Sequence, residues 1–171
     1  MGEENDFECL RCGTCCRNIL ENTGGVRRGL PLTEKEASLF PQEIISPKLA
    51  IGLTEPEIVV LYQLNVNKCP HINEENQCQK YECRPLMCRS FPIVADDISN
   101  RCKVFSYRRV GVSYCEPYSM ARQLEASDKF NGYILKSLRE HFKKGVKIWE
   151  LDLSTGKWIF KKRYDTSPEK P

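Results

Sequence analysis

Four cysteines stand within eight residues near the start of the chain, in the run Cys9-Leu10-Arg11-Cys12-Gly13-Thr14-Cys15-Cys16. Two Cys-x-x-Cys pairs overlap in this run, so the sulfurs of Cys9, Cys12 and Cys15 can converge on one metal or cluster. Cys16 follows directly, and because adjacent side chains diverge, we expect it to serve a second centre or another face of the same one. The run is therefore interpreted first as a metal site.

The chain has ten cysteines among 171 residues, a length that can bury an ordinary core without disulfides. The first residues have neither the basic nor the apolar stretch of a secretion signal. No apolar run approaches the ~20 residues that span a bilayer. We therefore predict a cytoplasmic protein with no membrane contact, whose thiols stay reduced and available as ligands. A disulfide framework is the alternative that both arguments disfavour.

A second set of cysteines lies in the middle of the chain, with eight, four and four residues between successive members. These spacings fit no single zinc-ribbon pattern. The set comprises Cys69, Cys78, Cys83 and Cys88, and Cys102 and Cys115 follow on or beside predicted strands. For Cys83 and Cys102, an ordinary buried thiol and a metal ligand are equally consistent with the sequence.

The two sets together resemble a known family. The segments Phe7-x-Cys9-x-x-Cys12-Gly13-x-Cys15-Cys16, Cys69-Pro70, Cys78 and Tyr81-Glu82-x-Arg84-Pro85-x-x-Cys88-Arg89-x-Phe91-Pro92 are similar to the CxxCxxCC family of zinc- or iron-chelating, YkgJ-type cysteine-cluster proteins. Flagellin lysine N-methylase is similar to this family too. The resemblance implies eight cysteine ligands, at Cys9, Cys12, Cys15, Cys16, Cys69, Cys78, Cys88 and Cys115. The last position is an imperfect match, because the family has Cys-Pro-Gly where this chain has Cys115-Glu116-Pro117, so Cys102 remains a rival.

Arginines accompany the cysteines of the second set. Four thiolates around Zn²⁺ leave a net charge of about −2, and a cluster held by four thiolates is also anionic, so a partly buried site needs cations around it. We assign this role to Arg84 and Arg89, with solvated surface arginines as the alternative. A change of Arg89 to Glu is then expected to lower metal retention.

Zinc and iron–sulfur both suit this composition. Zinc favours closed sites with four S or N ligands, and eight thiolates divide into two such sites. The Cys-x-x-Cys-x-x-Cys run with a distant Cys69-Pro70 also resembles a bacterial ferredoxin half-motif, which holds a [4Fe–4S] cluster. We favour the iron–sulfur cluster slightly, and expect His71 to be a loop residue and not a ligand.

Three functions remain open. The first is a metal-binding protein for electron transfer or metal chelation, and the second is an enzyme similar to a protein lysine N-methylase. The chain lacks both the G-x-G-x-x-G loop of dinucleotide-binding enzymes and the Cys-x-x-x-Cys-x-x-Cys run of radical S-adenosylmethionine enzymes, which weakens the enzyme hypothesis. The third is a structural zinc module that docks a protein or RNA partner.

Charge is unevenly distributed along the chain. Residues 136–171 hold ten Lys or Arg against five Asp or Glu, a net charge of +5. The whole chain has a net charge of +3, so the remaining residues sum to −2. Such a segment could meet nucleic acid or an acidic protein partner. More often it is a solvated surface, so we do not expect nucleic acid to be a partner, although the composition does not exclude it.

The hydrophobic pattern predicts an α+β fold: a small antiparallel sheet with several helices, the cysteine loops gathered at one end, and the strand order undetermined. Thr33 and Glu36 have capping-box spacing and predict a helix start. Residues 58–64, 91–95 and 103–107 are predicted strands, 119–144 a long helix with Gly145 after its end, and 146–164 a hairpin. Phe130, Phe142, Trp149 and Trp158 are expected in the core. We predict a single domain over residues 1–165, with a frayed tail at 166–171.

Overall fold

The computed structural model describes residues 12–91, 93–95, 102–104 and 121–167. The helical elements are α1 (Thr14–Arg17), α2 (Glu34–Ala37), α3 (Leu86–Ser90) and α4 (Ala121–Glu140), with the 3-10 turns η1 (Gln42–Ile44) and η2 (Tyr81–Cys83). The strands are β1 (Glu21–Thr23), β2 (Val26–Arg28), β3 (Pro31–Leu32), β4 (Ile45–Gly52), β5 (Ile58–Leu64), β6 (Ile93–Ala95), β7 (Cys102–Val104), β8 (Val146–Asp152) and β9 (Lys157–Tyr164).

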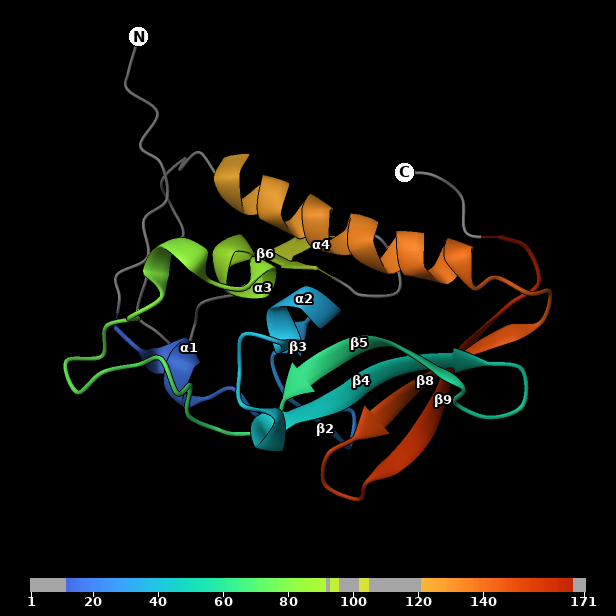
Figure 1. Ribbon diagram of the computed structural model, residues 1–171, viewed down its shortest axis with the longest axis horizontal. Coiled ribbons are helices and arrows are strands. Elements are labelled where there is room, and N and C mark those ends of the chain that lie inside the picture. The colour runs from blue at the N-terminus through green and yellow to red at the C-terminus, as the bar shows by residue number, and fades with distance from the viewer. Residues whose placement is uncertain (1–11, 92, 96–101, 105–120, 168–171) are drawn as a thin grey trace, which may run out of the picture.

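A five-stranded antiparallel sheet is the centre of the fold. Its strand order is β3-β5-β4-β8-β9, and β1 with β2, and β6 with β7, form separate two-stranded ribbons. Helices and antiparallel sheets together confirm the predicted α+β class. Figure 1 shows α4 lying along the sheet, with α1 and α3 beyond the β3 side of it. Among the described residues, no helix is long and apolar enough to cross a bilayer.

The main core lies between α4 and the middle of the sheet. Phe130, Ile134 and Leu138 recur every fourth residue along α4, which aligns them on one face of the helix. They pack against Leu49, Ile51, Val60, Leu61, Val146 and Ile148. The helix continues through Gly132, a residue that costs about 1 kcal/mol relative to alanine in a helix interior. The apolar stripe therefore outweighs this local preference.

The predicted helix and hairpin of the C-terminal third are present, with two corrections. Gly145 does not directly follow the helix, which ends at Glu140; it has φ of 82° in the turn that leads into β8. Phe130 lies in the main core and Phe142 packs against it, as expected. Trp149 and Trp158, also expected in the core, are instead half-buried on the other face of the hairpin. The strand alternation of β8 decides this, because Val146 and Ile148 take the inward positions.

A second core joins the edge of the sheet to the cysteine-bearing segments. Leu32, Leu64 and Phe40 are buried in it together with Ile19, which follows α1, and Cys69 packs against this cluster. The helix start predicted at Thr33 is confirmed, with a complete capping box between Thr33 and Glu36. The apolar side chains of this cluster thus position both cysteine segments relative to the sheet.

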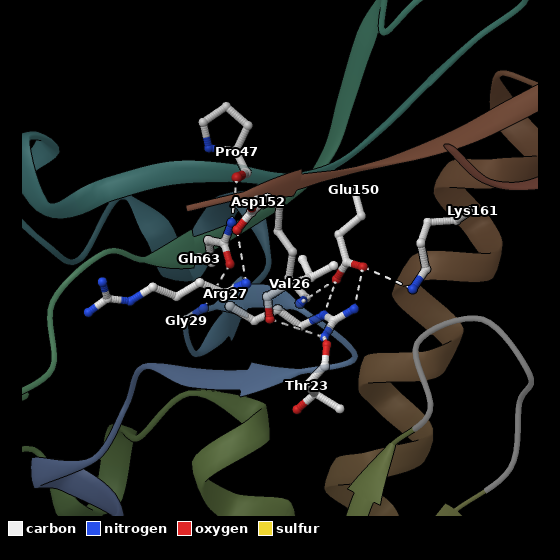
Figure 2. A network of polar contacts seen from close by, with 11 residues as sticks. Thr23, Val26, Arg27, Gly29, Pro47, Gln63, Glu150, Asp152 and Lys161 are labelled. Carbon is white, nitrogen blue, oxygen red and sulfur yellow. Dashed lines mark hydrogen bonds and ion pairs between the residues drawn. The ribbon is translucent and has the colours of Figure 1, made fainter. Parts of the chain in front are cut away.

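The glycine-rich segment 24–29 forms the turn and second strand of the β1–β2 ribbon. Gly24 and Gly25 have φ of 60° and 77°, the positive values that a tight hairpin turn with two left-handed central residues requires. Figure 2 shows how this ribbon docks: the Asp152 carboxylate accepts a hydrogen bond of 2.9 Å from the backbone N–H of Arg27. The buried Glu150 accepts two hydrogen bonds from the Arg28 guanidinium, at 2.6 and 2.8 Å.

Candidate metal centre

Short α1 presents two of the predicted ligands, Cys15 and Cys16, in one turn of helix. The turn begins after Gly13, whose φ of 73° is a conformation that side chains disfavour. A Cβ atom on Gly13 would lie 2.8 Å from atoms of both Ile72 and Asn76. Glycine here therefore allows the N-terminal cysteine segment to lie directly against the loop that follows Cys69.

The segment from Asn67 to Cys78 is tied to α1 by backbone hydrogen bonds. The N–H of Cys69 donates to the carbonyl of Cys16 at 2.7 Å, and the N–H of Ile19 donates to the carbonyl of Asn67 at 3.0 Å. Ile72 and Cys78 form an isolated antiparallel bridge, so the loop folds back on itself. Two cysteines with eight residues between them, Cys69 and Cys78, are in this way brought to the same region.

The third cysteine segment is α3, which carries Cys88 one turn after Pro85. Pro85 stands at the N-cap, where its missing N–H leaves no hydrogen bond unmade. The Arg84 side chain folds back over η2: its Nε donates to the carbonyl of Tyr81 at 2.8 Å, and its guanidinium carbon lies 3.7 Å from the centre of the Tyr81 ring. Arg84 is therefore held in place beside the cysteines and does not extend freely into solvent.

Electrostatic coupling among five thiols indicates that the three segments converge. The Cys16 thiol donates a hydrogen bond to the Cys15 sulfur, which lowers the pKa of Cys15 to about 6 and raises the pKa of Cys16. Burial raises the pKa of the Cys88 thiol; the charges of Cys69 and Cys15 add to this rise, and Arg84 opposes it. Burial also raises the pKa of Cys69, and Cys78 is among the neighbours that contribute.

These thiols are neighbours without forming a ready ligand set. Within the part of the chain that the structure describes, no three Cys, His, Asp or Glu side chains stand in the arrangement of a metal site. Thiols with a raised pKa carry protons at neutral pH, whereas a metal is bound by the thiolate. Metal binding at this place would therefore release protons and draw the sulfurs closer together.

The donor types suit zinc or iron. Thiolates are the ligands of structural zinc sites and of iron–sulfur clusters, whereas Ca²⁺ and Mg²⁺ take oxygen ligands. Arg84 acts on both Cys15 and Cys88, as a cation beside an anionic thiolate site should. The residues present therefore fit a thiolate-bound metal.

The remaining predicted residues are distributed as follows. Cys12 is exposed, and its thiol donates to the Thr14 hydroxyl at 3.3 Å. Cys83 is also exposed, so it is not the buried thiol considered from the sequence. Arg89 is exposed on α3, and its charge acts on Glu125 of α4. Cys9 and Cys115 lie outside the described residues; Cys102 lies on β7, but its side chain is not described.

His71 lies in a turn, as expected of a loop residue. Its ring packs 5.0 Å from that of Phe40, and burial followed by the charge of Lys80 lowers its pKa. Its backbone N–H donates a hydrogen bond to the Cys69 sulfur. The residue thus supports the cysteine loop through its main chain and its ring packing.

Asn76 is a feature of this region that the sequence analysis did not identify. It has a positive φ of 66°, and its buried Oδ1 atom has no hydrogen-bond partner among the residues that the structure describes. The turn-like composition of residues 73–77 indicated a tight turn, but nothing in it distinguished Asn76 from its neighbours. The contact with Gly13, which only the folded chain creates, gives this residue its significance.

A comparison with family models matches residues 8–132, nearly three quarters of the chain, to CxxCxxCC, described as a "Putative zinc- or iron-chelating domain". The chain belongs to the CxxCxxCC family. The match confirms the resemblance based on the cysteine runs, and it supports zinc or iron as what this CxxCxxCC protein chelates. No curated protein and no solved structure matches the chain.

Proposed function

We propose that this CxxCxxCC protein binds an iron–sulfur cluster, with zinc as the second candidate, through Cys15, Cys16, Cys69, Cys78 and Cys88. Cys9, Cys12 and Cys115 complete the proposed ligand set. The observation that carries the proposal is that thiols from three separate segments lie close enough to shift the pKa values of Cys15, Cys16, Cys69 and Cys88, with Cys78 among the contributing neighbours. A cytoplasmic location, which we also propose, would keep these thiols reduced.

One contact favours iron–sulfur over zinc. In a ferredoxin half-motif, a Cys-x-x-Cys-x-x-Cys run is completed by a distant cysteine followed by proline. Cys69 precedes Pro70, and its backbone N–H is hydrogen-bonded to Cys16 at 2.7 Å, directly after the run. Arg84 would offset part of the negative charge of thiolates at this place. When bound, such a cluster would supply one-electron chemistry, and a zinc ion would supply structural cross-linking alone.

The test is metal analysis of the full chain purified without oxygen. We expect iron and acid-labile sulfide in similar amounts and a broad absorbance near ~400 nm from thiolate-ligated iron. A colourless protein with stoichiometric zinc would favour the second candidate. Protein containing neither metal above trace amounts would refute both.

Cysteine variants test the ligand set. Cys69→Ser and Cys88→Ser should each lower metal content severalfold, because oxygen is a poorer ligand than thiolate for these metals. Cys83→Ser is the matched control, since this thiol lies in the same segment but is exposed. Equal losses in Cys83→Ser and Cys88→Ser would contradict the assignment.

Electron transfer and metal chelation are separated by a redox titration of the loaded protein. A reversible change in absorbance on reduction, without loss of metal, would support electron transfer. Release of metal on reduction or on challenge with a chelator would support chelation. The methylase-like hypothesis would need binding of S-adenosylmethionine, which calorimetry on the same samples measures.

A further inference from the structure

The C-terminal hairpin has a second face that α4 does not cover. Val146 and Ile148 of β8 point into the main core, so the intervening residues of this strand point to the opposite side of the sheet. The cross-strand register adds their partners from β9. We call this surface the outer face of the hairpin, made of Lys147, Trp149 and Leu151 on β8 and Trp158, Phe160 and Arg163 on β9.

Aromatic side chains form the middle of the outer face. Phe160 is 50% exposed, and its ring meets that of Trp149 edge-on, with centroids 5.9 Å apart at 70°. Trp158 lies two cross-strand pairs further along, opposite Leu151. Within the described part of the chain, the buried Nε1–H of Trp149 has no hydrogen-bond partner. An exposed ring that rests against a second, fixed ring is a firm stacking surface for another flat group.

Two cations stand at one end of this aromatic row. Lys147 and Arg163 are directly opposite each other in the register of β8 and β9. Like charges at such a cross-strand pair destabilise a sheet. Arg163 meets Asp165, but this contact is exposed at both side chains and so is largely screened. Lys147 leans toward the Trp149 ring, with Nζ 5.8 Å from its centroid. The positions of both cations therefore suit an anion bound beside the rings.

We propose that the outer face of the hairpin binds single-stranded nucleic acid. Bases would stack on Phe160 and Trp158, and Lys147 with Arg163 would contact the phosphates. Aromatic rings on a sheet, next to cations that follow the backbone, are the combination used by proteins that bind single strands. Among the described residues, this surface is separate from the cysteine segments, and the proposal does not depend on the metal.

The charge of the wider segment supports this partner over an apolar protein surface. Residues 136–171 carry five more cations than acidic groups, and Lys161, Lys162 and Arg163 are consecutive. An apolar protein partner on the outer face would bury the charges of Lys147 and Arg163, which is costly. A phosphate backbone compensates them and releases its own counterions.

The experiment uses the full chain and fluorescently labelled 12-nucleotide oligo-U and oligo-dT, with anisotropy measured from about 50 to 200 mM salt. Phe160→Ala should weaken binding about fivefold or more, because a stacking ring contributes roughly 1–3 kcal/mol per base. Phe160→Tyr, which keeps an aromatic ring, should bind as tightly as the unsubstituted protein. The double variant Lys147→Gln/Arg163→Gln should lower the salt slope by about 1.4, at roughly 0.7 per phosphate contact on a single strand.

The matched control is Lys143→Gln/Lys144→Gln, which removes the same charge from two exposed residues before the hairpin. We expect a smaller loss of binding from this control and no effect on stacking. Equal losses in the two double variants would overturn the proposal, since net charge alone would then explain binding. It would also be overturned by no binding at 50 mM salt, by an unchanged affinity in Phe160→Ala, or by tighter binding to anionic lipid vesicles than to the oligonucleotides.

Discussion

The carboxylate of Glu36 accepts a hydrogen bond from the backbone N–H of Leu86 at 2.6 Å, which joins the capping box of α2 to the first residue of α3. Its other oxygen accepts from the N–H of Thr33 at 2.9 Å. One side chain thus satisfies the first turns of two helices, and the second of these carries Cys88. The position of the proposed ligand Cys88 thus depends on a contact between Leu86 and a residue 50 positions earlier in the chain.

Glu36→Ala should therefore affect stability and metal content together. Two backbone donors lose their acceptor, and each unsatisfied donor costs about 1–3 kcal/mol when buried. Urea unfolding measures the free energy of unfolding, and metal analysis measures retention at the cysteines. Glu34→Ala removes a carboxylate from the same turn and should change the free energy of unfolding far less; an equal effect would mean that helix charge, and not the link to Leu86, is responsible.

Gly13→Ala tests the contact between the N-terminal cysteine segment and the loop after Cys69. The added methyl would lie 2.8 Å from atoms of Ile72 and Asn76, so one segment must move. We expect metal content to fall while the circular dichroism of the sheet is retained. Gly24→Ala is the control, because it has the same left-handed backbone, with φ of 60°, but open space around it. If both variants retain metal equally well, close contact at Gly13 is unimportant for the site.

Glu150 makes stability depend on acid pH. Its side chain is 2% exposed and contacts Arg28, Lys161 at 2.9 Å and Lys48 at 3.3 Å. Burial alone would raise the pKa of Glu150, but the hydrogen bonds from Arg28 and Lys161 and the charge of Lys48 outweigh it and lower the pKa to about 2. Because the folded pKa lies below the unfolded one, this stabilisation is complete above about pH 4.5 and is lost as pH falls toward 2.

Glu150→Gln should accordingly lower the free energy of unfolding by about 3 kcal/mol at pH 7, because it leaves buried cations without their counter-charge. The same variant should flatten the fall in stability between pH 4.5 and 2. Chemical unfolding at several pH values measures both effects. Glu140→Gln, which breaks an exposed pair with Lys136, should cost less than about 0.5 kcal/mol. A comparable cost in the two variants would argue against a role for burial.

Substitutions of Arg84 and Arg89 should affect metal retention to different degrees, although both residues flank Cys88. Arg84 acts on Cys15 and Cys88 and is held by Tyr81, so Arg84→Gln should lower metal retention severalfold, and Arg84→Lys should restore it in part. Arg89→Glu, expected from the sequence to lower retention as well, should have the smaller effect, because Arg89 is exposed toward Glu125. Competition with a chromogenic chelator ranks the variants; a larger loss in Arg89→Glu than in Arg84→Gln would reverse this assignment.

Local patterns in the sequence predicted much of the fold. The strand at 58–64, the capping box at Thr33 and the C-terminal hairpin each depend on periodicity or turn residues within a short window, and all three are present. The central strand β4 was not predicted, because Ser46, Pro47 and Lys48 interrupt its apolar pattern. Its place between β5 and β8 depends on partners far along the chain, which local propensity does not encode.

For the site, the sequence alone determined the chemistry: the spacing of the cysteines identified the family and the class of metal, because ligand type and turn length are properties of a few adjacent residues. The folded chain was needed to show which thiols are neighbours, that Arg84 acts on them while Arg89 acts on Glu125, and that Lys147 stands opposite Arg163. These relationships join residues distant in the chain. They arise from the packing of Ile19 and Cys69 on the second core and of α3 on the main core, and from strand register, which the pairing of whole strands fixes.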